Sequence, residues 1–216
     1  LKAGAKVLYI TAKTAKTVST TVDTGKPETI TGLRAIIDAY QKGKDTTPIV
    51  FRIIGKVSLS DLDGISSSAE GLQVKGATMN MTFEGVGDDA TVYGFGFLLR
   101  EAVSVEFGNF AIMRCLDDAM SLDTKNSHVW IHNMDLFYGK KGSAADQAKG
   151  DGTVDIKGDS KYFTVAYNRF WDNGKASMCG MKSETGENWI TYHHNWFDHS
   201  DSRMARVRTM SVHMYN

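Results

Sequence analysis

The sequence predicts an all-β solenoid, a stack of coils that each contain short strands. Two observations support this: alternating apolar runs recur along most of the chain, and an Asn follows many of them. Those asparagines are Asn109, Asn133, Asn168, Asn195 and Asn216, at spacings of 24, 35, 27 and 21 residues. Self-similarity near two dozen residues, without intervening helices, is typical of stacked coils.

The runs themselves are typical strands, broken by Gly, Asp, Asn and Ser. They include "PIVFRIIG", "MNMTFEGVG", "SVEFGNFAIM", "HVWIHNMDLF", "YFTVAYNRFW", "NWITYHHNWF" and "MSVHMYN". A β-sandwich is the alternative, but sandwich strands recur every 8–12 residues or so. The longer repeat favours the solenoid, in which stacked asparagine amides can hydrogen-bond from coil to coil.

One helix is expected before the strands, over residues 31–42. Leu33, Ile36, Ile37 and Tyr40 share one face of it, with Thr31 as a cap and Gly43 as a stop. A solenoid needs its open ends covered, and we expect this helix to cap the first coil. The long interval between Asn133 and Asn168 contains "YGKKGSAADQAKG", residues 138–150, which reads as a loop on one face.

Length and composition limit the possible partners. The 216 residues are expected to form one domain, 1–216, and their 25 acidic and 25 basic residues balance. This gives no general argument for a nucleic-acid or anionic-membrane partner. No apolar run is long enough for a membrane span, and no signal peptide is visible at the N-terminus. Cys115 and Cys179 lie in apolar contexts, so we expect buried free thiols.

Acidic and basic side chains gather in four patches of the second half. They are Asp117 and Asp118; Asp151, Asp155 and Lys157; Lys175; and Arg203, Arg206 and Arg208. Taken alone, each is most often a solvated turn or strand edge. In a solenoid, patches at equivalent positions of successive coils lie about 4.8 Å apart. The acids of neighbouring coils would then converge, with the bases beside them. Carboxylates from separate coils suit calcium, and the bases suit an anionic ligand.

The stretch 149–158, "KGDGTVDIKG", poses a geometric difficulty for such a site. Asp151 and Asp155 share one face of a strand, but a straight strand separates them by roughly 13 Å. Ligands of one calcium ion need to lie roughly 5 Å apart or less. A bend at Gly152 is therefore expected if both carboxylates bind one ion.

These motifs together resemble the pectate lyases of polysaccharide lyase family 1. The matching segments are "DDAMSL…HVWI", "DGTVDIKGDSKYFTVAYNRFWDNGKASMCG", "ENWITYHHNWFDHSDSRMARVR" and "SVHMYN". The resemblance covers roughly residues 30–216. It implies a right-handed parallel β-helix, Ca²⁺, secretion, and cleavage of polygalacturonate by β-elimination.

The resemblance also implies roles for single residues. Asp118, Asp151 and Asp155 match the calcium ligands, with Asp117 a weaker candidate. Lys175 and Arg208 match residues that hold the substrate's carboxylates, and Lys157 is a less certain member of that set. Arg203 matches the Brønsted base.

The chain departs from the family's pattern at three points. His132 stands where an Asp is usual, which removes a charge expected near the site, and Ala205 stands where Pro is usual. The chain also stops at "HMYN", where the family continues for further coils. We therefore expect a β-helix truncated at its C-terminal end, with the missing coils on a second chain or segment as one option.

Two other functions are compatible with the sequence. A pectin lyase would act on methylated pectin without calcium, and the three aspartates argue against it. A non-catalytic β-helix could bind acidic polysaccharide, and Arg203 and Lys175 argue against that. The four tryptophans could stack on sugar rings. Trp171 and Trp196 lie next to Phe residues in the repeat and better fit packing positions, whereas stacking remains an option for Trp130 and Trp189.

Overall fold

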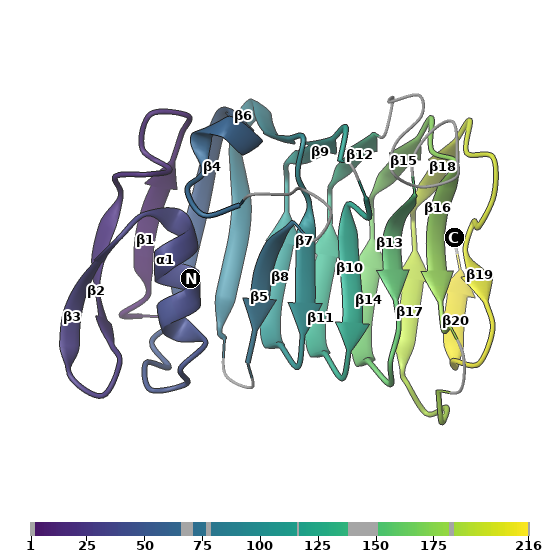
Figure 1. Cartoon of the computed structure of the whole chain (residues 1–216). Helices are drawn as coiled ribbons and strands as arrows, with labels where there is room; N and C mark the ends of the chain where they lie inside the picture. The colour runs from purple at the N-terminus through teal and green to yellow at the C-terminus, as the bar shows by residue number, and fades with distance from the viewer. Residues whose placement is uncertain are drawn as a thin grey trace.

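Parallel strands wind through three rows in a stack of coils (Figure 1). The computed structural model describes residues 3–65, 71–76, 79–115, 117–137, 151–181 and 184–215. The expected loop at 138–150 lies outside these residues. In chain order the elements are β1 (Lys6–Ile10), β2 (Ser19–Asp23), β3 (Pro27–Thr31), α1 (Leu33–Tyr40), β4 (Ile49–Ser58), the 3₁₀ turn η1 (Leu59–Asp61), β5 (Leu72–Lys75), β6 (Met81–Tyr93), β7 (Phe97–Arg100), β8 (Val103–Gly108), β9 (Ala111–Met113), β10 (Met120–Thr124), β11 (Ser127–His132), β12 (Asp135–Phe137), β13 (Gly152–Ile156), β14 (Lys161–Ala166), β15 (Arg169–Trp171), β16 (Lys175–Cys179), β17 (Ile190–His193), β18 (Trp196–Asp198), β19 (Arg206–Val207) and β20 (Val212–Tyr215).

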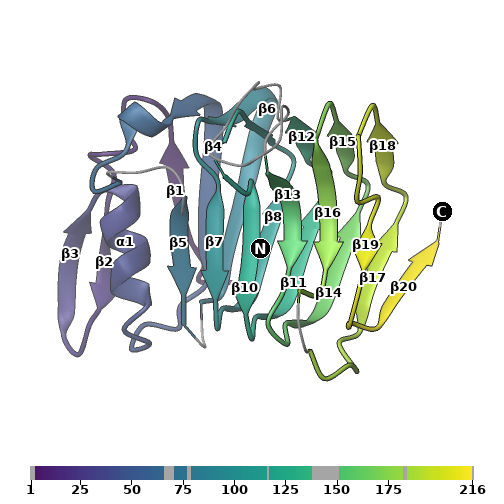
Figure 2. The same ribbon diagram turned by 45° about the vertical axis from the view of Figure 1, so that its right-hand side comes forward.

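Each coil adds one strand to each row. The long row is β1–β4–β6–β8–β11–β14–β17–β20, and the six-stranded sheet is β5–β7–β10–β13–β16–β19. The short row, β9–β12–β15–β18, joins the long row because β6 turns the corner and pairs with both β8 and β9. All these pairings are parallel (Figure 2). The predicted stack of coils is confirmed, and the β-sandwich alternative is wrong.

The core forms columns because the register repeats from coil to coil. Phe51 pairs with Phe83, which pairs with Phe107. Their rings stack at centroid distances of 5.1 Å, close to one strand spacing. All three side chains are fully buried. Burial of such rings contributes about 1.5–3 kcal/mol each.

The predicted asparagine stack is only partly present. Asn168 Nδ2 donates to Asn195 Oδ1 at 3.0 Å and to the Ile131 carbonyl at 3.0 Å. Asn133 instead occupies the preceding, left-handed position of its turn, with φ of 51°, beside His132. The asparagines therefore shift by one residue between coils, which breaks the stack. Asn216 lies outside the described residues.

A second polar stack at another turn was not predicted. Asn126 N donates to Ser160 Oγ at 3.1 Å, and Asn188 Nδ2 donates to the Ser160 carbonyl at 3.2 Å. All three residues are buried. Because Ser interrupts the Asn pattern, the repeat is not apparent in the sequence.

The N-terminal helix lies where the sequence places it, beside the β2–β3 hairpin at one end of the stack (Figure 1). Leu33, Ile36, Ile37 and Tyr40 are buried as predicted. The predicted cap is wrong, because Thr31 ends β3 and Gly32 takes the N-cap position with φ of 96°.

The two cysteines are buried and free, which confirms that prediction. Burial raises the pKa of both thiols. Among the described residues, no helix is both long and apolar enough to span a bilayer.

Candidate active site

A cleft lined by acidic and basic side chains, called the acidic cleft below, lies on the outer face of the six-stranded sheet. It has a volume of about 530 Å³ and gathers charged side chains from five strands or their ends. Every site residue expected from the sequence lines it: Asp117, Asp118, Asp151, Asp155, Lys157, Lys175, Arg203 and Arg208. The parallel register therefore brings together groups that are up to 91 residues apart.

Register explains this convergence. Ser121 of β10 pairs with Asp155 of β13, Asp155 pairs with Met178 of β16, and Met178 pairs with Arg206 of β19. These four residues form a straight row across the cleft. Gly152 pairs with Lys175 nearer the strand starts, so the ammonium group joins the acids of the preceding coil.

Three half-buried carboxylates form the acid trio Asp117, Asp118 and Asp151. One oxygen from each lies within 4.8 Å of the others. Two ligands at about 2.4 Å from one calcium ion are separated by at most about that distance. Burial, followed by the charges of Asp118 and Asp151, raises the pKa of Asp117. Such crowding of negative charge favours a bound cation.

Asp155 lies beside the trio but is more deeply buried, at 3% exposed. Its Oδ2 accepts a hydrogen bond from Arg203 at 3.4 Å, and its Oδ1 has no hydrogen-bond partner among the described residues. Burial and the nearby Asp118 charge raise its pKa to about 7, against the opposing effects of Lys157 and Arg203. A buried carboxylate oxygen without a partner is costly, and a hard cation would satisfy it.

The bend expected at Gly152 is present. Gly152 is the first residue of β13 and pairs with Lys175 of β16. A Cβ at this position would collide with the Asp155 carboxyl group. In a straight strand these two residues would lie roughly 10 Å apart and point to opposite faces. The chain therefore bends here and brings the Asp155 carboxyl group over Gly152.

Two lysines are paired with the trio. Lys157 Nζ lies 3.1 Å from Asp118 Oδ2 and 3.0 Å from Ser121 Oγ. Lys175 Nζ lies 2.9 Å from Asp151 Oδ1. Burial lowers the pKa of Lys157, but the Asp118 and Asp155 carboxylates outweigh it and raise the pKa overall. Both ammonium groups are thus held at the cleft wall.

The arginines come from the last described turns. The Arg203 side chain is 18% exposed, and its backbone carbonyl accepts a hydrogen bond from Ser177 N at 2.7 Å. Arg208 is exposed, and its backbone N–H donates to the Cys179 carbonyl at 2.9 Å. Ala205, the substitute for the usual Pro, packs against the core.

His132 does not affect this cleft. It ends β11 in the long row, and its Nε2 lies 3.0 Å from Glu106 Oε1. The expectation that it removes a charge near the site is wrong, because the residue belongs to another sheet.

Sequence reasoning missed three further polar residues that line the cleft. They are Ser121, and the ion pair between Arg100 Nε and Asp123 Oδ2 at 2.6 Å. Their signal was available, since Asp123 follows Ser121 by two residues on the same face of β10.

A family model described as pectate lyase matches residues 10–216. The chain belongs to the pectate lyase family. Among curated relatives, a pectate trisaccharide-lyase from Bacillus licheniformis is 26% identical over 196 residues, covering 89% of this chain and 55% of the relative. Pectate lyase 2 from Pectobacterium carotovorum is 31% identical over 158 residues, covering 70% of this chain and 42% of the relative. The chain thus spans about half the length of these family members.

Solved pectate lyases share the fold. The enzyme from Bacillus sp. N165, in complex with trigalacturonate, superposes with a TM-score of 0.72 at 20% identity, over 99% of this chain and 62% of that one. Pectate lyase C from Erwinia chrysanthemi, at pH 9.5 with 30 mM Ca²⁺, superposes with a TM-score of 0.72 at 23% identity, over 99% of this chain and 61% of that one. The parallel β-helix is confirmed. Nothing in these comparisons supports a second chain that supplies further coils.

Proposed function

We propose that this chain carries the active site of a calcium-dependent pectate lyase, which cleaves polygalacturonate by β-elimination. The observation that carries the proposal is the acid trio beside a row of lysines and arginines in one cleft. Family membership and the relatives' names support the same activity.

The trio fits Ca²⁺ by the chemistry of its donors. Asp117, Asp118 and Asp151 supply hard oxygen ligands at compatible separations, and Asp155 Oδ1 is a fourth oxygen that needs a partner. When bound, calcium would neutralise a substrate carboxylate and stabilise negative charge that develops beside it.

The lysines would change partners when the acids bind a metal ion and a substrate. Lys157 and Lys175 are paired with Asp118 and Asp151. Once those carboxylates take another cation, both ammonium groups can turn to the carboxylates of galacturonate. Together with Arg208 they would orient the uronate and stabilise its enolate-like charge.

Arg203 is the proposed base. The C5 proton of a galacturonate unit is α to a carboxylate and is weakly acidic. Arg203 would accept that proton, the C5–H electron pair would form the C4=C5 double bond, and the C4–O bond would break. A guanidinium group stays protonated at neutral pH, so the base form is scarce. The rate should therefore rise above pH 7.

Absorbance of the unsaturated uronide product tests this proposal directly. Polygalacturonate would be the substrate at alkaline pH, with calcium in one series and a chelator in the other. We expect a rise that the chelator abolishes and that Arg203→Lys strongly reduces. Equal activity on methylated pectin in the presence of chelator would favour a pectin lyase. Binding of calcium and polygalacturonate with no product would favour a non-catalytic protein.

The proposed substrate also implies secretion. Polygalacturonate is a polymer outside the cells that degrade it, so the enzyme must reach it there. Activity in the culture supernatant, with little in the cell lysate, would support this proposal. Activity retained wholly within cells would contradict it.

A further inference from the structure

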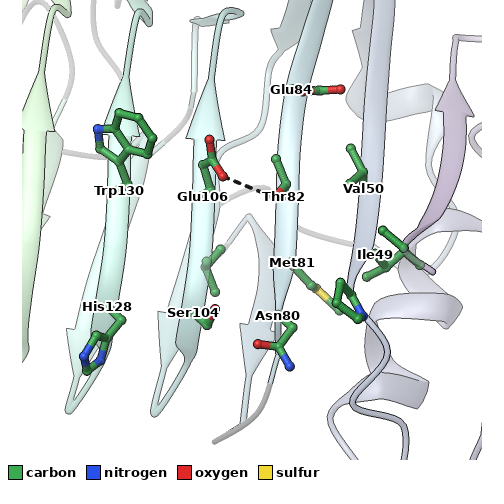
Figure 3. Close-up of a pocket in the computed structure, with 13 residues that line it drawn as sticks. Ile49, Val50, Asn80, Met81, Thr82, Glu84, Ser104, Glu106, His128 and Trp130 are labelled. Carbon is green, nitrogen blue, oxygen red and sulfur yellow. Dashed lines mark hydrogen bonds between the residues drawn. The ribbon is translucent and has the colours of Figure 1, made fainter. Parts of the chain in front are cut away.

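A second groove lies on the outer face of the long row, on a different sheet from the acidic cleft (Figure 3). It crosses β4, β6, β8 and β11 and has a volume of about 590 Å³. The side chains that carry the argument below are Val50, Thr82, Glu84, Glu106, His128 and Trp130.

The groove is hollow because side chains of different size share one row. Val50 pairs with Thr82, Thr82 with Glu106, and Glu106 with Trp130. The row therefore spans three strand spacings, roughly 14 Å. Short side chains make its floor at Val50 and Thr82, whereas Trp130 and His128 stand at one side (Figure 3).

Trp130 is a preformed platform. It is 46% exposed, yet its ring lies against His132 at a centroid distance of 3.9 Å, with the two planes tilted by 31°. His132 is held in turn by Glu106 at 3.0 Å and Asn133 at 2.9 Å. Gly108 leaves space for the imidazole, since a Cβ there would overlap the ring. A ring fixed in advance loses little entropy when a ligand binds.

The charges of the groove disfavour a polyuronate. Its described lining residues include Glu84 and Glu106 but no Lys or Arg, although Arg52 beside the lining pairs with Glu84 at 2.6 Å. Galacturonate carboxylates would face these acids, and like charges in contact are unfavourable. This is the opposite of the acidic cleft, where lysines and arginines surround the trio.

Neutral sugars match what the groove presents. Carboxylates and the Thr82 hydroxyl can accept or exchange hydrogen bonds with sugar hydroxyls; Thr82 Oγ1 already lies 3.4 Å from Glu106 Oε2. The apolar face of a pyranose ring can pack on the indole of Trp130. We propose that this groove binds a neutral polysaccharide and so anchors the protein apart from its proposed catalytic cleft.

Affinity electrophoresis tests this in native gels that contain soluble β-1,4-galactan, xyloglucan or galactomannan. We expect at least one of them to retard the protein. Trp130→Ala and Thr82→Tyr should each weaken the apparent dissociation constant by about tenfold or more. Trp130→Ala removes the aromatic platform. Thr82→Tyr fills the floor of the groove and leaves the platform in place. Trp189→Ala is the matched control, because Trp189 is 62% exposed before β17 and does not line the groove.

Several outcomes would overturn the proposal. One is migration unaffected by all three neutral polymers. Another is retardation that persists in both groove variants, or that Trp189→Ala removes equally. Lys175→Ala should reduce binding of polygalacturonate but leave the neutral-polymer retardation intact, and loss of both together would show that only one site exists. Thermal unfolding of each variant would verify the fold.

Discussion

Asp117 offers the sharpest test of the metal site, because the resemblance made it the weakest ligand candidate and the structure places it in the trio. At about 2.4 Å, a divalent ion and a unit charge interact by about 3.5 kcal/mol even at the dielectric constant of water. An Asn side chain at this position keeps a carbonyl oxygen as a ligand, so it retains part of that interaction energy. We therefore expect Asp117→Asn to weaken calcium binding by about 2 kcal/mol, or about thirtyfold in Kd.

Calorimetric titration of calcium into the wild type and the variant measures this effect. Asp123→Asn is the control, since Asp123 lines the same cleft but is paired with Arg100. We expect a change of about threefold or less in that variant. The raised pKa of Asp117 adds a second signature: the carboxyl keeps its proton to higher pH than usual, so wild-type affinity should fall on acidification earlier than for an ordinary Asp. An unchanged Kd in Asp117→Asn would refute the assignment.

Three further predictions concern the fold that supports the site. Burial raises the pKa of Asp45, but hydrogen bonds from Lys6 and from backbone and side-chain groups nearby outweigh it and lower the pKa to about 2. The paired carboxylate therefore contributes about 2 kcal/mol to the free energy of unfolding above pH 4, and this contribution is lost as the pH falls toward 2. In urea unfolding, Asp45→Asn should be less stable than the wild type at pH 7, and the difference should be smaller near pH 2. Gly152→Ala should displace the Asp155 carboxyl and reduce lyase activity more than tenfold, whereas a variant with full activity would show that the glycine has no such role. Asn168→Ala should lower the free energy of unfolding by about 2 kcal/mol, because it leaves buried backbone groups unpaired; an unchanged urea midpoint would contradict this.

The sequence grouped the charged residues of the cleft correctly because a solenoid keeps its phase. Residues at the same position of successive coils must stack, so Asp118, Asp151 and Lys175 could be grouped before any coordinates existed. The helix and the buried cysteines were predictable for a different reason, because local apolar patterns indicate them.

The sequence predictions were wrong where a shift of one residue along a turn, or the place where a coil turns, decided the role of a residue. Thr31 and Asn133 were each placed one position from their actual roles. His132 was expected near the site but lies in the long row, because repeat spacing does not reveal where a coil turns its corner.

The sequence by itself determined the stacked coils, their family and the set of charged residues, because periodicity and residue type are local properties of the chain. Only the tertiary structure decided which of those residues lie close enough to share one cation, which lysine pairs with which acid, and where the second groove lies. Those relations depend on strand register between coils, and register is fixed by packing of the whole core rather than by any single repeat.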